Sequence, residues 1–190
     1  MKARSQSEGL TTRDTSIFHL PFARCTQRTL FMLSTRAAAY TLGAGGAIPF
    51  VALTPQFAPH LPSPPLRDNP AHWQCVYGAS ILSFLGGVQW GTCISASSSP
   101  SALARLAWSV TPSLIAWPAA ATSATLPEQQ SHRLSLPLVA GGLASSCIAD
   151  TRIFHAGLPS WYSPLRLALS TIAIASLAAT SLHSSQRTHG

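Results

Sequence analysis

The sequence predicts an all-α fold, a polytopic membrane protein of about five transmembrane helices packed as a small bundle. Three observations predict it: few charges, apolar segments of spanning length, and glycines within those segments. Only 9% of the 190 residues are charged, against roughly 25% in soluble globular domains. A soluble domain would need more charge to cover its surface, and disorder would need lower hydrophobicity or higher net charge. The composition therefore favours a membrane protein.

The net charge of +7 does not indicate a nucleic-acid partner. Six of the twelve basic residues lie within residues 1–36, and the others are scattered singly along the chain. A nucleic-acid-binding domain would show a basic stripe or a known motif, and neither is present. Basic residues that flank apolar segments are better explained by the positive-inside rule or by a targeting signal.

Five apolar segments are predicted to span the bilayer, each about as long as the roughly 20 residues that a crossing requires, although the fourth is short. They are Ala37–Phe57, Trp73–Ser95, Leu103–Ala121, Leu134–Asp150 and Pro164–His183. The connection Ala58–His72 contains five prolines and is predicted to be a stiff polar loop with no helix. The chain is thus divided into an N-terminal extension (1–36), a membrane domain (37–183) and a short polar tail (184–190).

The extension, residues 1–36, carries six basic residues and many Ser and Thr, but only two acids, Glu8 and Asp14. This composition is typical of a mitochondrial transit peptide, and a disordered tail is the alternative. The mitochondrial inner membrane is the expected location. With five spans, the basic residues from Arg24 onward divide into six on the N-terminal side and three on the other, so the N-terminal side is expected inside, in the matrix or cytoplasm.

Nine of the twelve glycines lie inside the predicted spans. Small residues allow helix backbones in a membrane to approach closely. In the second span, small residues recur every four positions and are the candidates for helix packing: Ala79, Ser83, Gly87 and Gly91. Homodimerisation through the same strip is the alternative.

Two charged residues at span ends, Asp150 and Arg166, form a candidate polar pair. An acid inside the membrane is costly and marks a functional site. The alternatives are a solvated or capping role for Asp150 and an interfacial anchor role for Arg166 beside Trp161 and Tyr162. Gln89 offers a polar group in the second span. The four cysteines form no CxxC pair and the seven histidines show no metal-binding spacing, so no catalytic residue, cofactor or metal site is expected.

Several short strings occur in order along the chain: Leu42–Phe50, Tyr77–Gly91, Ser109–Trp117, Asp150 and Pro159–Arg166. The most specific is Ser-Phe-Leu-Gly-Gly-x-x-Trp-Gly, at positions 83–91. In this order the strings resemble the transmembrane protein 69 family, whose shared domain is a multi-helix membrane domain of unassigned function. The resemblance covers about Ala37 to Leu182. It implies a membrane fold and brings no catalytic residues with it.

Three classes of function are compatible with this sequence. A structural or assembly component of the mitochondrial inner membrane, in contact with lipid and with other membrane proteins, is favoured because few ionisable groups fall within the spans. A small transporter or channel with a polar path near Gln89 and Asp150 is the alternative. A membrane enzyme is least favoured, because the His, Asp or Glu clusters of interfacial catalysis are missing, and the chain is expected not to be an enzyme.

Overall fold

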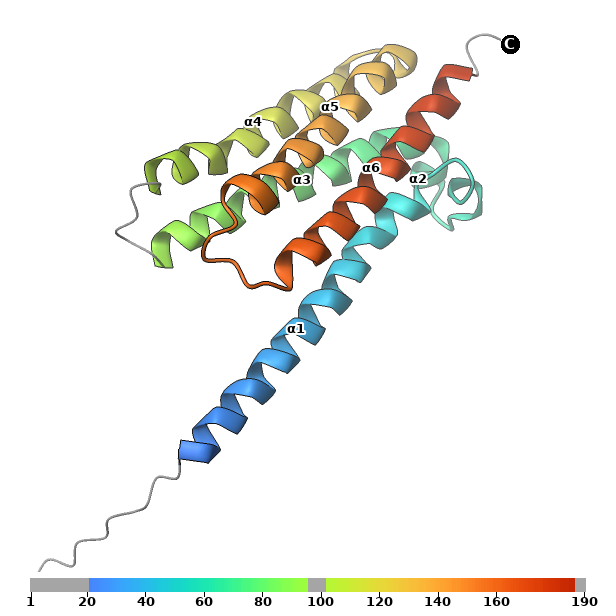
Figure 1. The fold of residues 1–190 in the computed structure, drawn as a ribbon. Helices are drawn as coiled ribbons and strands as arrows, with labels where there is room; N and C mark the ends of the chain where they lie inside the picture. Colours follow the sequence, from blue (N-terminus) through green and yellow to red (C-terminus); the bar gives the residue numbers. More distant parts are fainter. Residues whose placement is uncertain (1–20, 96–101, 187–190) are drawn as a thin grey trace, which may run out of the picture. The chain divides into compact units, whose positions relative to one another are not determined.

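The computed structural model describes residues 21–95 and 102–186, and within these ranges it contains helices and connections but no strand. The all-helical class is therefore confirmed. Five helices are long: α1 (Pro21–Ala52), α3 (Pro70–Ser95), α4 (Ala102–Thr125), α5 (Glu128–Ile148) and α6 (Tyr162–Gln186). They follow one another along the chain in the colours of Figure 1. Each overlaps one of the five predicted spans.

The chain divides into two units, Met1–Ala37 and Ala38–Gly190. In the first unit, Pro21–Ala37 is helical, and residues 1–20 of the predicted extension lie outside the described residues. The contacts among α3, α4, α5 and α6 lie within the second unit. There α3 packs against α4 and α5, and α5 also packs against α4 and α6 (Figure 1). The centre is filled by large side chains that are almost fully buried: Leu82, Leu136, Val139, Leu143 and Leu177.

Helix ends differ from the predicted spans where local chemistry stops or prolongs the helix. The first span was predicted to reach Phe57, but α1 ends at Ala52, where the Thr54 hydroxyl donates to the carbonyl of Val51 at 2.7 Å and Pro55 follows. The short fourth span is prolonged by a π-helical turn, η2 (Ala149–Ile153). By length and composition alone, two segments are apolar enough to cross a membrane, Gln130–Ile153 and Tyr162–Ser184.

The prediction of no helix between Ala58 and His72 is wrong. This stretch contains a 3₁₀ turn, η1 (Ala58–His60), and a short helix, α2 (Pro64–Asp68), and α3 begins at Pro70. Each begins with or next to a proline, which fits the first turn of a helix because its missing N–H would have no partner there. The side chain of Asn69 then accepts the N–H of His72 at 3.2 Å and caps α3.

The small-residue strip is only partly a contact face, so the prediction for Gly87 and Gly91 as intramolecular packing residues is wrong. Ala79 is buried and Ser83 is half-buried, but Gly87 and Gly91 are exposed, and a Cβ added at either would meet no heavy atom within 4 Å. Each step of four residues turns a helix about 40° beyond a full circle. Three steps therefore carry the strip about 120° away from the core.

Other glycines mark the close helix contacts. A Cβ at Gly86 would overlap the backbone carbonyl oxygen of Ser109 on α4. One at Gly78 would lie 2.7 Å from Cγ1 of Val139, and one at Gly142 would overlap Cδ2 of Leu82. Gly86 lies seven residues after Ala79, and seven residues return to nearly the same face of a helix. The contact face of α3 therefore follows steps of seven rather than of four.

Candidate functional site

A cluster of buried polar side chains joins α3, η2 and α6, and its centre is the carboxylate of Asp150. Asp150 lies in the π-helical turn, where the N–H of Phe154 donates to the carbonyl of Ala149 at 2.7 Å. Such widened turns are frequent at functional sites. The side chain is only 2% exposed. A charged group at this depth requires partners.

Both carboxylate oxygens of Asp150 have partners. Oδ1 accepts a hydrogen bond from Nε2 of Gln89 at 2.7 Å. Oδ2 accepts one from Nε of Arg166 at 2.9 Å, which makes a buried ion pair, and a weaker one from the Tyr162 hydroxyl at 3.2 Å. Nη1 of Arg166 donates in turn to Oγ of Ser170 at 2.7 Å. Four side chains from α3 and α6 are thus tied, directly or through Arg166, to one turn at the end of α5.

The cluster is electrically neutral and mostly satisfied. Two of its polar atoms have no partner among the described residues, Oε1 of Gln89 and Nη2 of Arg166. A buried ion pair adds little stability relative to apolar residues of the same shape, but it is costly to break. The arrangement is therefore suited to fixing how three helices meet. A carboxylate that already accepts three hydrogen bonds is poorly placed to act as a base.

A second polar group lies where the start of α3 meets the end of α4 and the start of α5. Nδ1 of His72 is 2.8 Å from Oγ of Ser123 and 3.1 Å from its carbonyl oxygen. Sγ of Cys75 donates to the carbonyl of Ala119 at 3.4 Å, and the buried hydroxyls of Ser123 and Ser135 lie beside the same thiol. Within residues 21–95 and 102–186, no group of three or more His, Cys, Asp or Glu side chains is arranged to hold a metal ion.

Apolar side chains separate the two polar groups. Gln74, which lies between His72 and Cys75 in the sequence, marks the second group on α3, and Gln89 marks the first. Both side chains are buried, and they are 15 residues apart, or about 22 Å along the helix. Between them Leu82 is fully buried, and it packs near Gly142 on α5, beside the buried Val139 and Leu143. Leu82, Val139 and Leu143 therefore form an apolar layer between the two groups.

The structure brings together three of the polar residues that the sequence analysis selected: Asp150, Arg166 and Gln89. Tyr162 and Ser170 were not predicted as site residues from the sequence. Tyr162 was considered only as a neighbour of Arg166 at the membrane interface, but its hydroxyl also donates to Asp150. Ser170 lies one helical turn after Arg166, so the i, i+4 spacing was the available signal.

Comparison with known proteins identifies the family of this chain. A family model described as "Protein of unknown function (DUF3429)" matches residues 35–182, most of the chain. Transmembrane protein 69 of Xenopus tropicalis is 36% identical over 152 residues, which cover 78% of this chain and 55% of that protein. This chain belongs to the transmembrane protein 69 family. The resemblance seen in the ordered sequence strings is thereby confirmed.

A second member of the transmembrane protein 69 family, from Mus musculus, is 28% identical over 159 residues, or 79% of this chain and 58% of that protein. The chain thus spans little more than half the length of the curated family members it matches. No solved structure matches it significantly. The names of these family members support a membrane protein, and neither name states an activity, a substrate or a partner.

Proposed function

We propose that the chain is a five-span protein of the mitochondrial inner membrane that acts as a structural or assembly component and has no catalytic activity. The observation that carries the proposal is the polarity of the described bundle, which is apolar outside and partly polar inside. The interior holds Gln74, Gln89, Asp150 and Arg166, each at most 5% exposed. A bundle of this kind is suited to lipid surroundings, where polar side chains join helices.

The outer surface supports all five spans, including the three that hydropathy alone does not select. Each long helix exposes large apolar side chains: Leu42 and Ile48 on α1, Phe84 and Ile94 on α3, Leu114 and Trp117 on α4, Leu138 and Ile148 on α5, and Leu167 and Leu182 on α6. Phe84 is 70% exposed and Trp117 is 75% exposed. Soluble monomers seldom expose apolar patches of more than a few hundred Å².

A protease-protection experiment on a C-terminal tag tests the number of spans and the location together. Five crossings place the two ends of the bundle on opposite sides, and the excess of basic residues places the N-terminal end in the matrix. A tag added after Gly190 should therefore resist protease in intact mitochondria and be digested once the outer membrane is opened. A tag that stays protected in those mitoplasts would mean an even number of spans or the opposite orientation.

The assembly role predicts stable neighbours in the membrane. Blue-native electrophoresis of the mildly solubilised protein should show a complex much larger than the 20.0 kDa chain, and crosslinking should capture the same neighbours in the native membrane. An exposed, uncharged substitution such as Leu114→Ala, which leaves the buried cluster intact, serves to map the contact surface. A monomer in every detergent and no crosslinked neighbour would contradict the role.

A transporter or channel with a polar path near Gln89 and Asp150 is the second candidate. The partnerless atoms Oε1 of Gln89 and Nη2 of Arg166 favour it, since a passing solute could bond to them. The apolar layer around Leu82 and Val139 counts against it, because the layer would have to open in every transport cycle. Solute flux in liposomes that is lost on Asp150→Asn would select this candidate.

A further inference from the structure

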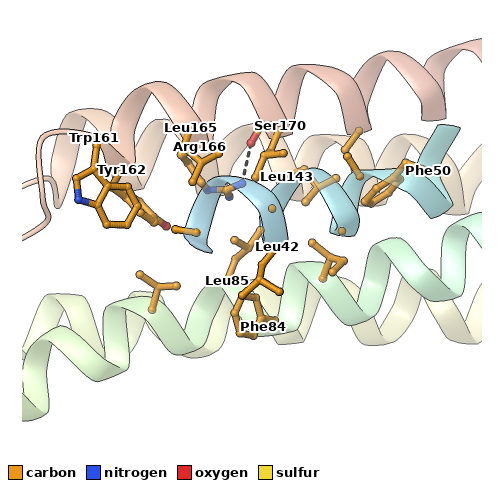
Figure 2. Close-up of a pocket in the computed structure, with 18 residues that line it drawn as sticks. Leu42, Phe50, Phe84, Leu85, Leu143, Trp161, Tyr162, Leu165, Arg166 and Ser170 are labelled. Carbon is orange, nitrogen blue, oxygen red and sulfur yellow. Dashed lines mark hydrogen bonds between the residues drawn. The ribbon is translucent and has the colours of Figure 1, made fainter. Parts of the chain in front are cut away.

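Beside the polar cluster lies an apolar cavity of about 400 Å³, lined by α1, α3, α5 and α6. Figure 2 shows Arg166 and Ser170 on its α6 side, with Phe84 and Leu85 on its α3 side. Its polar side chains, Trp161, Tyr162, Arg166 and Ser170, all belong to or adjoin α6. The volume is in the range of sites that hold small molecules.

We propose that this cavity binds one acyl chain of a membrane phospholipid, with the ester carbonyl of that chain at the level of Arg166. The inference rests on the proposed membrane location and goes beyond the structural role. It requires a ligand that is long, apolar and equipped with one neutral hydrogen-bond acceptor near its end.

The length and depth of the cavity fit an acyl chain. The lining residues on α6 extend from Tyr162 to Ala173, or about 16 Å along the helix. One leaflet of the hydrocarbon core is about 15 Å thick. Trp161 and Tyr162 are of the type that lies at the headgroup level. Arg166 is one turn deeper, at the boundary where the ester groups of phospholipids lie.

The chemistry of Arg166 favours a neutral acceptor. Its charge is already balanced by Asp150, so an anionic headgroup in the cavity would bring in an uncompensated negative charge. Its Nη2 is a buried donor with no partner. A water molecule would need two or more polar partners, and most of the remaining wall is apolar. Because Nη2 is covered, the carbonyl reaches it as wall side chains shift when the chain enters.

Two neighbouring glycines provide a matched pair of variants. Gly46 lines the cavity, and a Cβ there would meet only the Tyr77 hydroxyl, at 3.8 Å. Gly45 does not line it, and a Cβ there would meet nothing within 4 Å. Gly46→Phe should fill part of the cavity, whereas Gly45→Phe adds the same side chain to the exposed surface. Thermal unfolding in detergent checks that both variants fold.

The probe is a phosphatidylcholine with a diazirine in its acyl chain, in liposomes that contain the purified full chain. Wild type and Gly45→Phe should be labelled at cavity residues such as Leu169, and Gly46→Phe should lose most of that labelling. A competition experiment on the wild-type protein tests the ester carbonyl without any substitution. Ester-linked phosphatidylcholine should displace the probe about two- to tenfold better than its ether-linked analogue, the ratio expected for one hydrogen bond.

The outcomes separate the two proposals. Labelling on outward residues such as Leu114 alone would show a membrane protein without this site and would overturn the inference. No labelling anywhere would contradict the membrane location itself. Displacement by a free fatty acid or a quinone at lower concentration than by phospholipid would also overturn the inference, because it would assign the cavity to another ligand.

Discussion

Asp150→Ala is expected to lower the free energy of unfolding by about 3–5 kcal/mol, because it leaves the buried guanidinium of Arg166 without its counter-ion. Arg166→Ala should cost a similar amount, since the carboxylate of Asp150 would then be buried with only neutral donors. Either loss is a large part of the stability of an ordinary domain. Denaturation in mixed SDS micelles measures the free energy, and the amount of protein in the membrane fraction gives a second reading.

Removing both charges is the informative control. Asp150→Leu combined with Arg166→Met leaves no unpaired charge, so the double variant should be more stable than either single alanine variant and within about 1–2 kcal/mol of wild type. A double variant no better than the singles would show that the two side chains are not energetically coupled. Exchanging the two charged residues should restore less stability than the neutral double variant does, because Gln89 and Tyr162 are positioned to donate to an acceptor at position 150.

Much of the fold could be predicted from the sequence because charge and proline mark where membrane helices stop. The five predicted spans each fall on a long helix, with errors of a few residues at most ends. The errors arise from local chemistry, such as the prolines that begin short helices in Ala58–His72. The π-helical turn has no sequence signal, yet it makes Asp150 an interior residue rather than a helix cap.

The sequence could predict the site only as a choice between two alternatives. Asp150 and Arg166 are both at span ends, and a span end is compatible with a solvated charge or with a pair. The tertiary arrangement selects the pair, because α5 and α6 are adjacent and antiparallel in Figure 1 across a short connection. Which of two adjacent glycines faces a neighbour is harder still. The direction of a helix face changes by 100° per residue, so a small error in the assumed period selects the wrong residue.

Gly86 and Gly87 therefore give the second strong prediction. Gly86→Ala is expected to destabilise the bundle by about 1–3 kcal/mol or more, because its Cβ would overlap the backbone carbonyl of Ser109 and α3 would have to move away from α4. A backbone atom cannot yield as the end of a flexible side chain can. Gly86→Leu should prevent accumulation of the folded protein in the membrane.

Gly87→Ala is the matched control, one residue away on the same helix. Its Cβ would meet nothing within 4 Å, and alanine favours the helix over glycine by up to about 1 kcal/mol in water, so stability should be unchanged or slightly higher. The two substitutions should change stability in opposite directions, because consecutive residues on α3 are separated by a rotation of 100° about the helix axis. Equal losses in both variants would contradict the assigned contact face. A loss of a dimer band in Gly87→Leu alone, at unchanged stability, would instead place Gly87 between two copies of the chain.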